Sequence, residues 1–317
     1  MGGEVETIGF LLVPKFSMMA FTSAIEPLRS ANRMSGRTLY RWRVYSKDGG
    51  PVRASSETVI APDAGIEDRA PLSALIVCAG IDVHLYRDKQ VFSWLRALAR
   101  KGVRIGGICT GTHVLARAGL LDGRRCTLHW ENIPGFVEEF PEITVTAELF
   151  EIDDNRFTCS GGTAPLDLML HMIGLEHGHR LATLISDQFI HDRIRGPHDH
   201  QRMALTSRLG VRDAKLLSVI TLMEANIEEP LSRAALAASV GLSTRQLERL
   251  FRRHLDRTPK QHYLEVRLRR ARQLLMQTDM SVLAVALACG FVSASHFSKC
   301  YRERIGLTPR QERREAA

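Results

Sequence analysis

Short apolar runs alternate with amphipathic segments through the first two-thirds of the chain. Three runs are continuously apolar and predict buried strands, at 7–14 (TIGFLLVP), 74–80 (ALIVCAG) and 103–109 (VRIGGIC). Helical periodicity appears between and after them, near 18–34, 88–101, 111–120, 163–175 and 178–191. Buried strands that alternate with helices predict a doubly wound α/β domain with a largely parallel sheet. Binding sites in such sheets lie at the carboxyl ends of the strands.

The last third of the chain has an all-helical pattern that occurs twice. LFRRHLDRTPKQ (250–261) aligns with CYRERIGLTPRQ (300–311), and LAASVG (236–241) aligns with VALACG (285–290). Each copy consists of a helix, a tight turn at a glycine and a second helix, which is the pattern of a helix-turn-helix unit. A continuous helix over 260–277 separates the copies; at 1.5 Å per residue it is about 27 Å long. Such a rod can hold two recognition helices about one turn of DNA apart, ~34 Å.

The second helix of each copy has an apolar inner face and a polar outer face. The residues expected to face inward are Leu247, Leu250 and Phe251 in the first copy and Phe297, Cys300 and Tyr301 in the second. Ser243 and Gln246 predict a capping box at the start of the first of these helices. We expect Arg245 and Arg249, with His296 or Lys299, to reach base edges. The full set expected to contact DNA is Ser243, Thr244, Arg245, Arg249, Arg252, Ser293, Ser295, His296, Lys299 and Arg302.

The charge distribution supports a polyanionic partner for the last third alone. Residues 201–317 hold 21 Lys and Arg against 11 Asp and Glu, a net charge of +10, whereas residues 1–200 carry a net charge of −2. A helical bundle with exposed arginines is the alternative interpretation of one copy. Two copies with matching faces favour binding to double-stranded DNA.

Targeting and metal-binding patterns are missing from the sequence. The six cysteines form no C-x-x-C pair, the first residues carry acids where a signal peptide needs Lys or Arg, and no stretch approaches 18 apolar residues. His198 and His200 flank Asp199 without the spacing of a metal site. We therefore expect a cytoplasmic protein with no membrane association, no metal and no cofactor.

The segment GICTG, residues 107–111, follows the third apolar strand and predicts a strained strand-to-helix elbow with Cys109 at its apex. A helix N-terminus favours a thiolate, and His129, twenty residues on, is a plausible base. No acid is evident that would orient the imidazole, so the triad is incomplete. The alternative is a small buried cysteine with no chemical role.

These residues, together with SGGTAPLDLML at 160–170, resemble the ThiJ/PfpI superfamily over roughly residues 6–190. In enzymes of that superfamily the cysteine is commonly followed by His or Ala, and here it is followed by Thr110. Many also place a glutamate after the first strand, where this chain has Ala20. The resemblance therefore implies the fold and the elbow but argues against the enzymatic reaction.

ALACGFVSASHFSKCYRERIGLTPRQ at 286–311 resembles the signature of the AraC/XylS regulators, over about residues 210–314. Joined to a ThiJ/PfpI-type domain, it is similar to the GlxA-like subgroup. Relatives in that subgroup respond to arginine and to betaine- or carnitine-type compounds. The segments FTSAIEPLRSANR (21–33) and CTLHWE (126–131) resemble the corresponding segments of those relatives.

Three segments are predicted: a sensing domain over 1–192, a linker over 193–207 and a DNA-binding domain over 208–317. The predicted function is sequence-specific regulation of transcription, with activation favoured, under control of a small nitrogenous metabolite. A cysteine-dependent enzyme or redox sensor with an appended DNA-binding domain is the alternative. RNA polymerase is an expected partner, and a homodimer is left open. The expected effector-binding residues are Glu26, Gly80, Cys109, Thr110, His129 and Trp130. Trp130 could face a cation or simply belong to the core.

Overall fold

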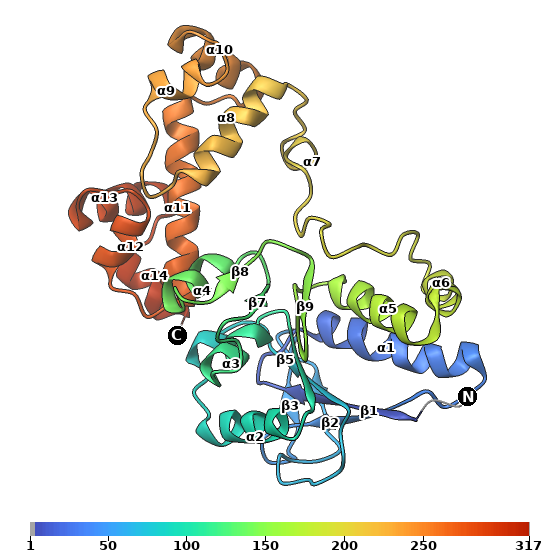
Figure 1. Cartoon of the computed structure of the whole chain (residues 1–317). Coiled ribbons are helices and arrows are strands. Elements are labelled where there is room, and N and C mark those ends of the chain that lie inside the picture. The colour runs from blue at the N-terminus through green and yellow to red at the C-terminus, as the bar shows by residue number, and fades with distance from the viewer. Residues whose placement is uncertain (1–3, 317) are drawn as a thin grey trace. The chain divides into compact units, whose positions relative to one another are not determined.

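The computed structural model describes residues 4–316. The chain forms two compact units that divide after Gln201, inside the predicted 193–207 linker (Figure 1). Within the described residues, no helix is long and apolar enough to cross a lipid bilayer.

The first unit is built on a six-stranded sheet in the order β2-β1-β5-β6-β10-β9. All neighbouring strands are parallel except the last pair, in which β9 runs antiparallel to β10. The strands are β1 (Glu6–Leu12), β2 (Tyr40–Tyr45), β5 (Ala74–Cys78), β6 (Arg104–Ile108), β9 (Phe150–Asp153) and β10 (Arg156–Cys159). The three predicted strands are confirmed as β1, β5 and β6, and the largely parallel α/β fold is confirmed. Two-stranded ladders also join β3 (Val52–Arg53) to β4 (Val59–Ile60) and β7 (Arg125–Cys126) to β8 (Thr144–Val145).

Helices cover both faces of this sheet. They are α1 (Met18–Ser35), α2 (Lys89–Arg100), α3 (Gly111–Arg117), α4 (Ile133–Glu139), α5 (Ala164–His177) and α6 (His179–Gln188), with a short 3-10 turn η1 at Val83–Leu85. On one face α1 and α5 lie side by side (Figure 1) and bury Leu28 and Leu168 against Phe10 of β1. On the other face α2 and α3 bury Leu95 and Leu115. The predicted helices exist, although α3 and α6 end at Arg117 and Gln188, three residues earlier than expected.

The second unit is entirely helical. Its helices are α7 (Leu205–Leu209), α8 (Ala214–Ala225), α9 (Arg233–Ala238), α10 (Thr244–Leu255), α11 (Pro259–Gln277), α12 (Val282–Ala288), α13 (Ala294–Ile305) and α14 (Pro309–Ala316). The long predicted helix is confirmed as α11, which runs between the two repeated helix pairs (Figure 1). Leu247 and Phe251 lie in a core formed with α8 and α9, and Phe297 and Tyr301 lie in a core formed with α11 and α12.

Candidate functional site

Cys109 occupies a strained elbow between β6 and α3, as the sequence predicts. Its φ is +59°, in the left-handed region that non-glycine residues rarely adopt. Glycines are required on both sides. A Cβ at Gly107 would lie 2.8 Å from the amide nitrogen of Thr112, and one at Gly111 would lie 2.2 Å from the carbonyl oxygen of Val77. The chain can turn this sharply only because neither glycine carries a side chain.

Three segments meet around the elbow at the carboxyl end of the sheet. The amide of His129 donates to the carbonyl oxygen of Cys109 at 3.1 Å. Gly161 lies between them, since a Cβ there would be 2.8 Å from Cδ2 of His129 and 3.0 Å from Sγ of Cys109. The ring centroid of Trp130 is 5.7 Å from that of His129. The elbow, the 127–130 segment and the turn at Gly161 therefore form the walls of one candidate site.

A hydrogen bond between Thr110 and Gly80 links the elbow to the segment that follows β5. Oγ1 of the buried Thr110 donates to the carbonyl oxygen of Gly80 at 2.6 Å. Gly80 in turn lies so close to the loop after β1 that an added Cβ would be 2.2 Å from the carbonyl oxygen of Lys15. The hydroxyl that replaces the family's usual His or Ala thus ties the elbow to the end of β5.

Glu26 is engaged elsewhere. Its carboxylate forms an ion pair with Arg29 on the same helix at 2.7 Å, and both side chains are 44% exposed. Ala20, at the position where related enzymes carry a glutamate, is buried. Glu131 places an acid near the imidazole instead, with Oε2 3.8 Å from Nδ1 of His129. That separation exceeds a hydrogen bond, so Glu131 supplies charge to the site without fixing the ring.

The prediction that the helix N-terminus would favour a Cys109 thiolate is wrong. Burial raises the pKa of the Cys109 thiol to about 12, and the hydrogen bond from the Thr110 amide offsets this only in part. The helix that follows has seven residues, so its dipole is short, whereas the desolvation of a buried thiolate is severe. Burial also lowers the pKa of His129, which keeps the imidazole neutral.

Residues 191–201, of which 193–201 belong to the predicted linker, form a strap that is bonded to the rest of the α/β unit. Its anchor is Asp167, a fully buried carboxylate in the first turn of α5. Asp167 accepts from the amide of Arg195 at 2.7 Å and from its Nε at 2.9 Å, and it lies 2.8 Å from Nε2 of His191. Nη2 of Arg195 also donates to Oγ1 of Thr163 at 2.8 Å. The sequence signal for this anchor is Asp167 within the apolar run APLDLML, because a charged residue is seldom buried unless it is paired.

The outer faces of α10 and α13 agree with the predicted pattern. Arg245, Arg249 and Arg252 are exposed on α10, and Ser295, His296, Lys299 and Arg302 are exposed on α13, whereas Thr244 is half-buried. Ser243 and Ser293 are the N-caps of these helices, and the capping box of Ser243 with Gln246 is present. Of the residues predicted to face inward, Leu250 and Cys300 are only half-buried. The ion pair of Glu248, on α10, with Arg233 has no counterpart in the sequence-based predictions.

Hydrogen bonds from α11 attach both helix-turn-helix units to this helix. Tyr263 of α11 donates from its hydroxyl to the carbonyl oxygen of Asn226 and accepts from the amide of Leu231 at 3.2 Å. Arg267 donates to the carbonyl oxygens of Cys289 and Gly290, both at 2.7 Å, and its guanidinium lies 4.1 Å from the ring centroid of Phe291. The loop before α9 and the turn after α12 are therefore both attached to α11.

Comparison with known proteins agrees with both halves of this description. The DJ-1/PfpI family model matches residues 6–175 and the helix-turn-helix domain model matches residues 236–315. The chain is 51% identical to the HTH-type transcriptional regulator GbdR of Pseudomonas aeruginosa, over 97% of this chain and 84% of that one. It is 40% identical to the regulator GlxA of Rhizobium meliloti, over 99% and 97%. The structure of an AraC family regulator from Pseudomonas putida covers 58% of this chain and 99% of its own, with a TM-score of 0.54 and 26% identity.

The chain belongs to the AraC family of transcriptional regulators. Its branch of the family carries a DJ-1/PfpI-type N-terminal domain, as the resemblance to the GlxA-like subgroup implied. The chain is a DNA-binding regulator of transcription, and the comparisons favour this function over an enzyme despite the elbow.

Proposed function

We propose that this AraC-family regulator senses a small nitrogenous metabolite, an amino acid or a quaternary ammonium compound, at the candidate site formed by Cys109, His129 and Trp130, which we call the elbow pocket. The observation that carries the proposal is the strained elbow itself, which the chain keeps although its cysteine is buried. Burial raises the pKa of Cys109 to about 12 and lowers that of His129, so the elbow keeps its geometry without presenting a thiolate nucleophile. Such a site can bind and release a molecule unchanged, which a sensor requires.

The chemistry of the walls favours a cationic group. The rings of Trp130 and His129 lie close together, and the half-exposed carboxylate of Glu131 adds negative charge beside them. An aromatic face attracts an ammonium group by about 0.5–2 kcal/mol. Glu26, committed to Arg29, is not required for this attraction.

On the DNA side, we propose that the exposed residues of α10 and α13 read an operator, with Arg245, Arg249, His296 and Lys299 reaching the bases. The exposure of these side chains on two helices held by one rigid α11 supports the proposal. We further propose that the regulator acts as an activator, that RNA polymerase is its partner at the promoter and that two copies bind one operator. Transcription with purified polymerase at a selected operator tests the first two claims, and the stoichiometry of the protein–DNA complex tests the third.

The sensing proposal is tested by thermal unfolding of the full chain with arginine, glycine betaine and carnitine. A compound that binds only the folded state raises the melting temperature. We expect Cys109→Ser to retain this shift, because a hydroxyl preserves the polar elbow and removes only nucleophilicity. His129→Ala should lose it, because it removes one wall. A shift that survives His129→Ala would place the binding site elsewhere, and loss of the shift in Cys109→Ser would contradict binding without thiol chemistry.

A further inference from the structure

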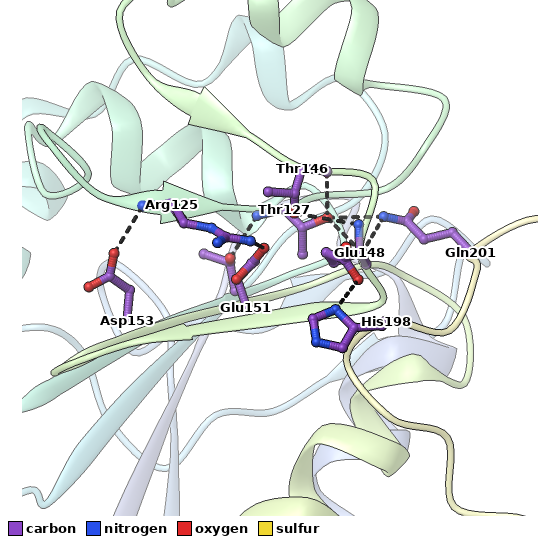
Figure 2. Close-up of polar contacts among 9 residues, drawn as sticks. Arg125, Thr127, Thr146, Glu148, Glu151, Asp153, His198 and Gln201 are labelled. Carbon is purple, nitrogen blue, oxygen red and sulfur yellow. Dashed lines mark hydrogen bonds and ion pairs between the residues drawn. The ribbon is translucent and has the colours of Figure 1, made fainter.

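Gln201 is the last residue of the α/β unit, and Arg202 begins the DNA-binding unit. The Gln201 carboxamide is not free in solvent but is held against the α/β unit, as Figure 2 shows. The two N–H groups of its Nε2 are shared among Oγ1 of Thr127 at 3.0 Å, the carbonyl oxygen of Leu128 at 3.1 Å and the carbonyl oxygen of Glu148 at 2.8 Å. The final side chain before the DNA-binding unit therefore binds three oxygens of one surface.

Two of those oxygens belong to the wall of the candidate effector pocket. Thr127 and Leu128 directly precede His129, and the amide of His129 is bonded to the carbonyl oxygen of Cys109. Thr127 is also attached from the other side, because Oγ1 of Thr112 in α3 donates to its carbonyl oxygen at 2.7 Å. The elbow, the wall and the end of the strap thus form one continuous set of hydrogen bonds.

Hydrogen bonds also hold the chain on both sides of this contact. The amide of Thr127 donates to Oγ1 of Thr158 on β10 at 2.8 Å, and Thr127 is fully buried. Upstream, the strap is fastened by Asp167 with Arg195. Because Gln201 bonds directly to Thr127 and Leu128, a displacement of these two residues changes the hydrogen bonds of Gln201.

The contact of Gln201 is also incompletely satisfied. Its Oε1 is buried and has no hydrogen-bond partner within the described part of the chain. An unpaired buried acceptor lowers the stability of the attached state. The unpaired acceptor therefore brings the free energies of attachment and release closer together, so that a bound molecule can more readily shift the balance between them.

We propose that Gln201 is the positioning residue that transmits occupancy of the elbow pocket to the DNA-binding unit. The inference rests on the proposed effector function of that pocket. A molecule that binds beside His129 displaces residues 127–129, which changes the attachment of Gln201 and thereby the freedom of the DNA-binding unit that begins at Arg202. Because coupling between two sites is reciprocal, detaching Gln201 must also loosen the wall over Cys109.

The reciprocal effect gives a test that needs no effector. Gln201→Glu places a carboxylate against three oxygens, and Gln201→Met keeps the approximate volume but donates no hydrogen bond. In the full chain, both variants should increase alkylation of Cys109 by iodoacetamide about fivefold or more, measured on the Cys109 peptide by mass spectrometry. They should also speed amide exchange across 127–130.

His198→Ala is the matched control. His198 lies on the same strap and contacts the same residue, with Nδ1 3.0 Å from Oε2 of Glu148 (Figure 2), but its side chain is 83% exposed and lies against the carboxylate and not the 127–128 wall. We expect wild-type alkylation and exchange in this variant. Unchanged alkylation in Gln201→Met, or an equal increase in His198→Ala, would overturn the proposal.

A second arm measures the DNA response. The probe is whichever of arginine, glycine betaine and carnitine raises the melting temperature of the wild type, and the DNA is a fragment selected with the wild-type chain. We expect Gln201→Met to retain the melting shift while its DNA affinity no longer changes with the probe. A retained DNA response, or loss of the melting shift, would overturn the proposal. If no compound shifts the wild type, the proposed pocket function fails and the alkylation arm alone decides the coupling.

Discussion

The two turn glycines of the repeated unit are equivalent in sequence but not in surroundings, and this difference makes a quantitative prediction. Gly241 and Gly290 both have a left-handed φ, +64° and +72°. A Cβ at Gly241 would meet no atom within 4 Å, whereas one at Gly290 would lie 2.5 Å from the carbonyl oxygen of Ile227 and 2.8 Å from that of Glu228. Both of those oxygens belong to the loop that precedes the first helix-turn-helix unit.

The expected losses of stability follow from these contacts. Gly241→Ala incurs only the strain of a left-handed alanine, about 1–2 kcal/mol. Gly290→Ala incurs the same strain and must also move a backbone segment, for which overpacking typically costs a further ~1–3 kcal/mol. Together, strain and overpacking should lower the free energy of unfolding of Gly290→Ala by about 2–5 kcal/mol. Because Gly290 lies in the turn of the second helix-turn-helix unit and packs against the loop before the first, this variant should also lose affinity for an operator that requires both recognition helices.

The assay can separate the two halves of the chain. All three tryptophans, Trp42, Trp94 and Trp130, lie in the α/β unit, so their fluorescence reports that unit while circular dichroism at 222 nm also reports the helical one. In urea titrations of the full chain, the helical transition of Gly290→Ala should move to lower urea than that of Gly241→Ala. The fluorescence transition should not move in either variant. Equal losses in the two variants would refute the argument that contact with the 227–230 loop fixes the turn.

Three further predictions concern the DNA contacts and the α/β unit. Arg245→Ala should flatten base preference at one operator position, by about 1–3 kcal/mol, whereas Arg252→Ala should weaken all sequences alike; identical profiles across operator variants would show that the faces are wrongly assigned. Asp167→Asn should lower the free energy of unfolding by about 3 kcal/mol in the fluorescence transition, because it removes the buried charge that anchors the strap; a loss under about 1 kcal/mol would contradict that anchoring role. Burial lowers the pKa of His113 from 6.5 to about 3. As the pH falls, His113 is therefore protonated in the unfolded chain before it is protonated in the folded one. Its contribution to the free energy of unfolding is complete above about pH 6.5 and is lost as the pH falls toward 3, by up to about 1.4 kcal/mol per pH unit. His113→Leu should flatten this slope between pH 6.5 and 5, and an unchanged slope would exclude His113 as its source.

The sequence alone determined the features that depend on local pattern. The repeat of helix, glycine turn and helix is recognisable in the amino-acid sequence, because amphipathic periodicity and capping residues such as Ser243 act over a few neighbouring residues. The elbow at Cys109 was predictable for the same reason, since flanking glycines are what a left-handed cysteine requires. The strands β1, β5 and β6 were predicted because central parallel strands are buried on both faces and are therefore continuously apolar.

Tertiary structure decided the features that depend on distant residues. The strand β2 was missed because YRWRVY mixes charged and aromatic positions, and β9 and β10 were missed because each spans only four residues. The protonation of Cys109 follows from how completely the fold excludes water, which no spacing reveals. The role of Gln201 follows from contacts 53 to 74 residues away along the chain. A linker and a bound strap have the same polar composition, and only the positions of Thr127, Leu128 and Glu148 in space distinguish them.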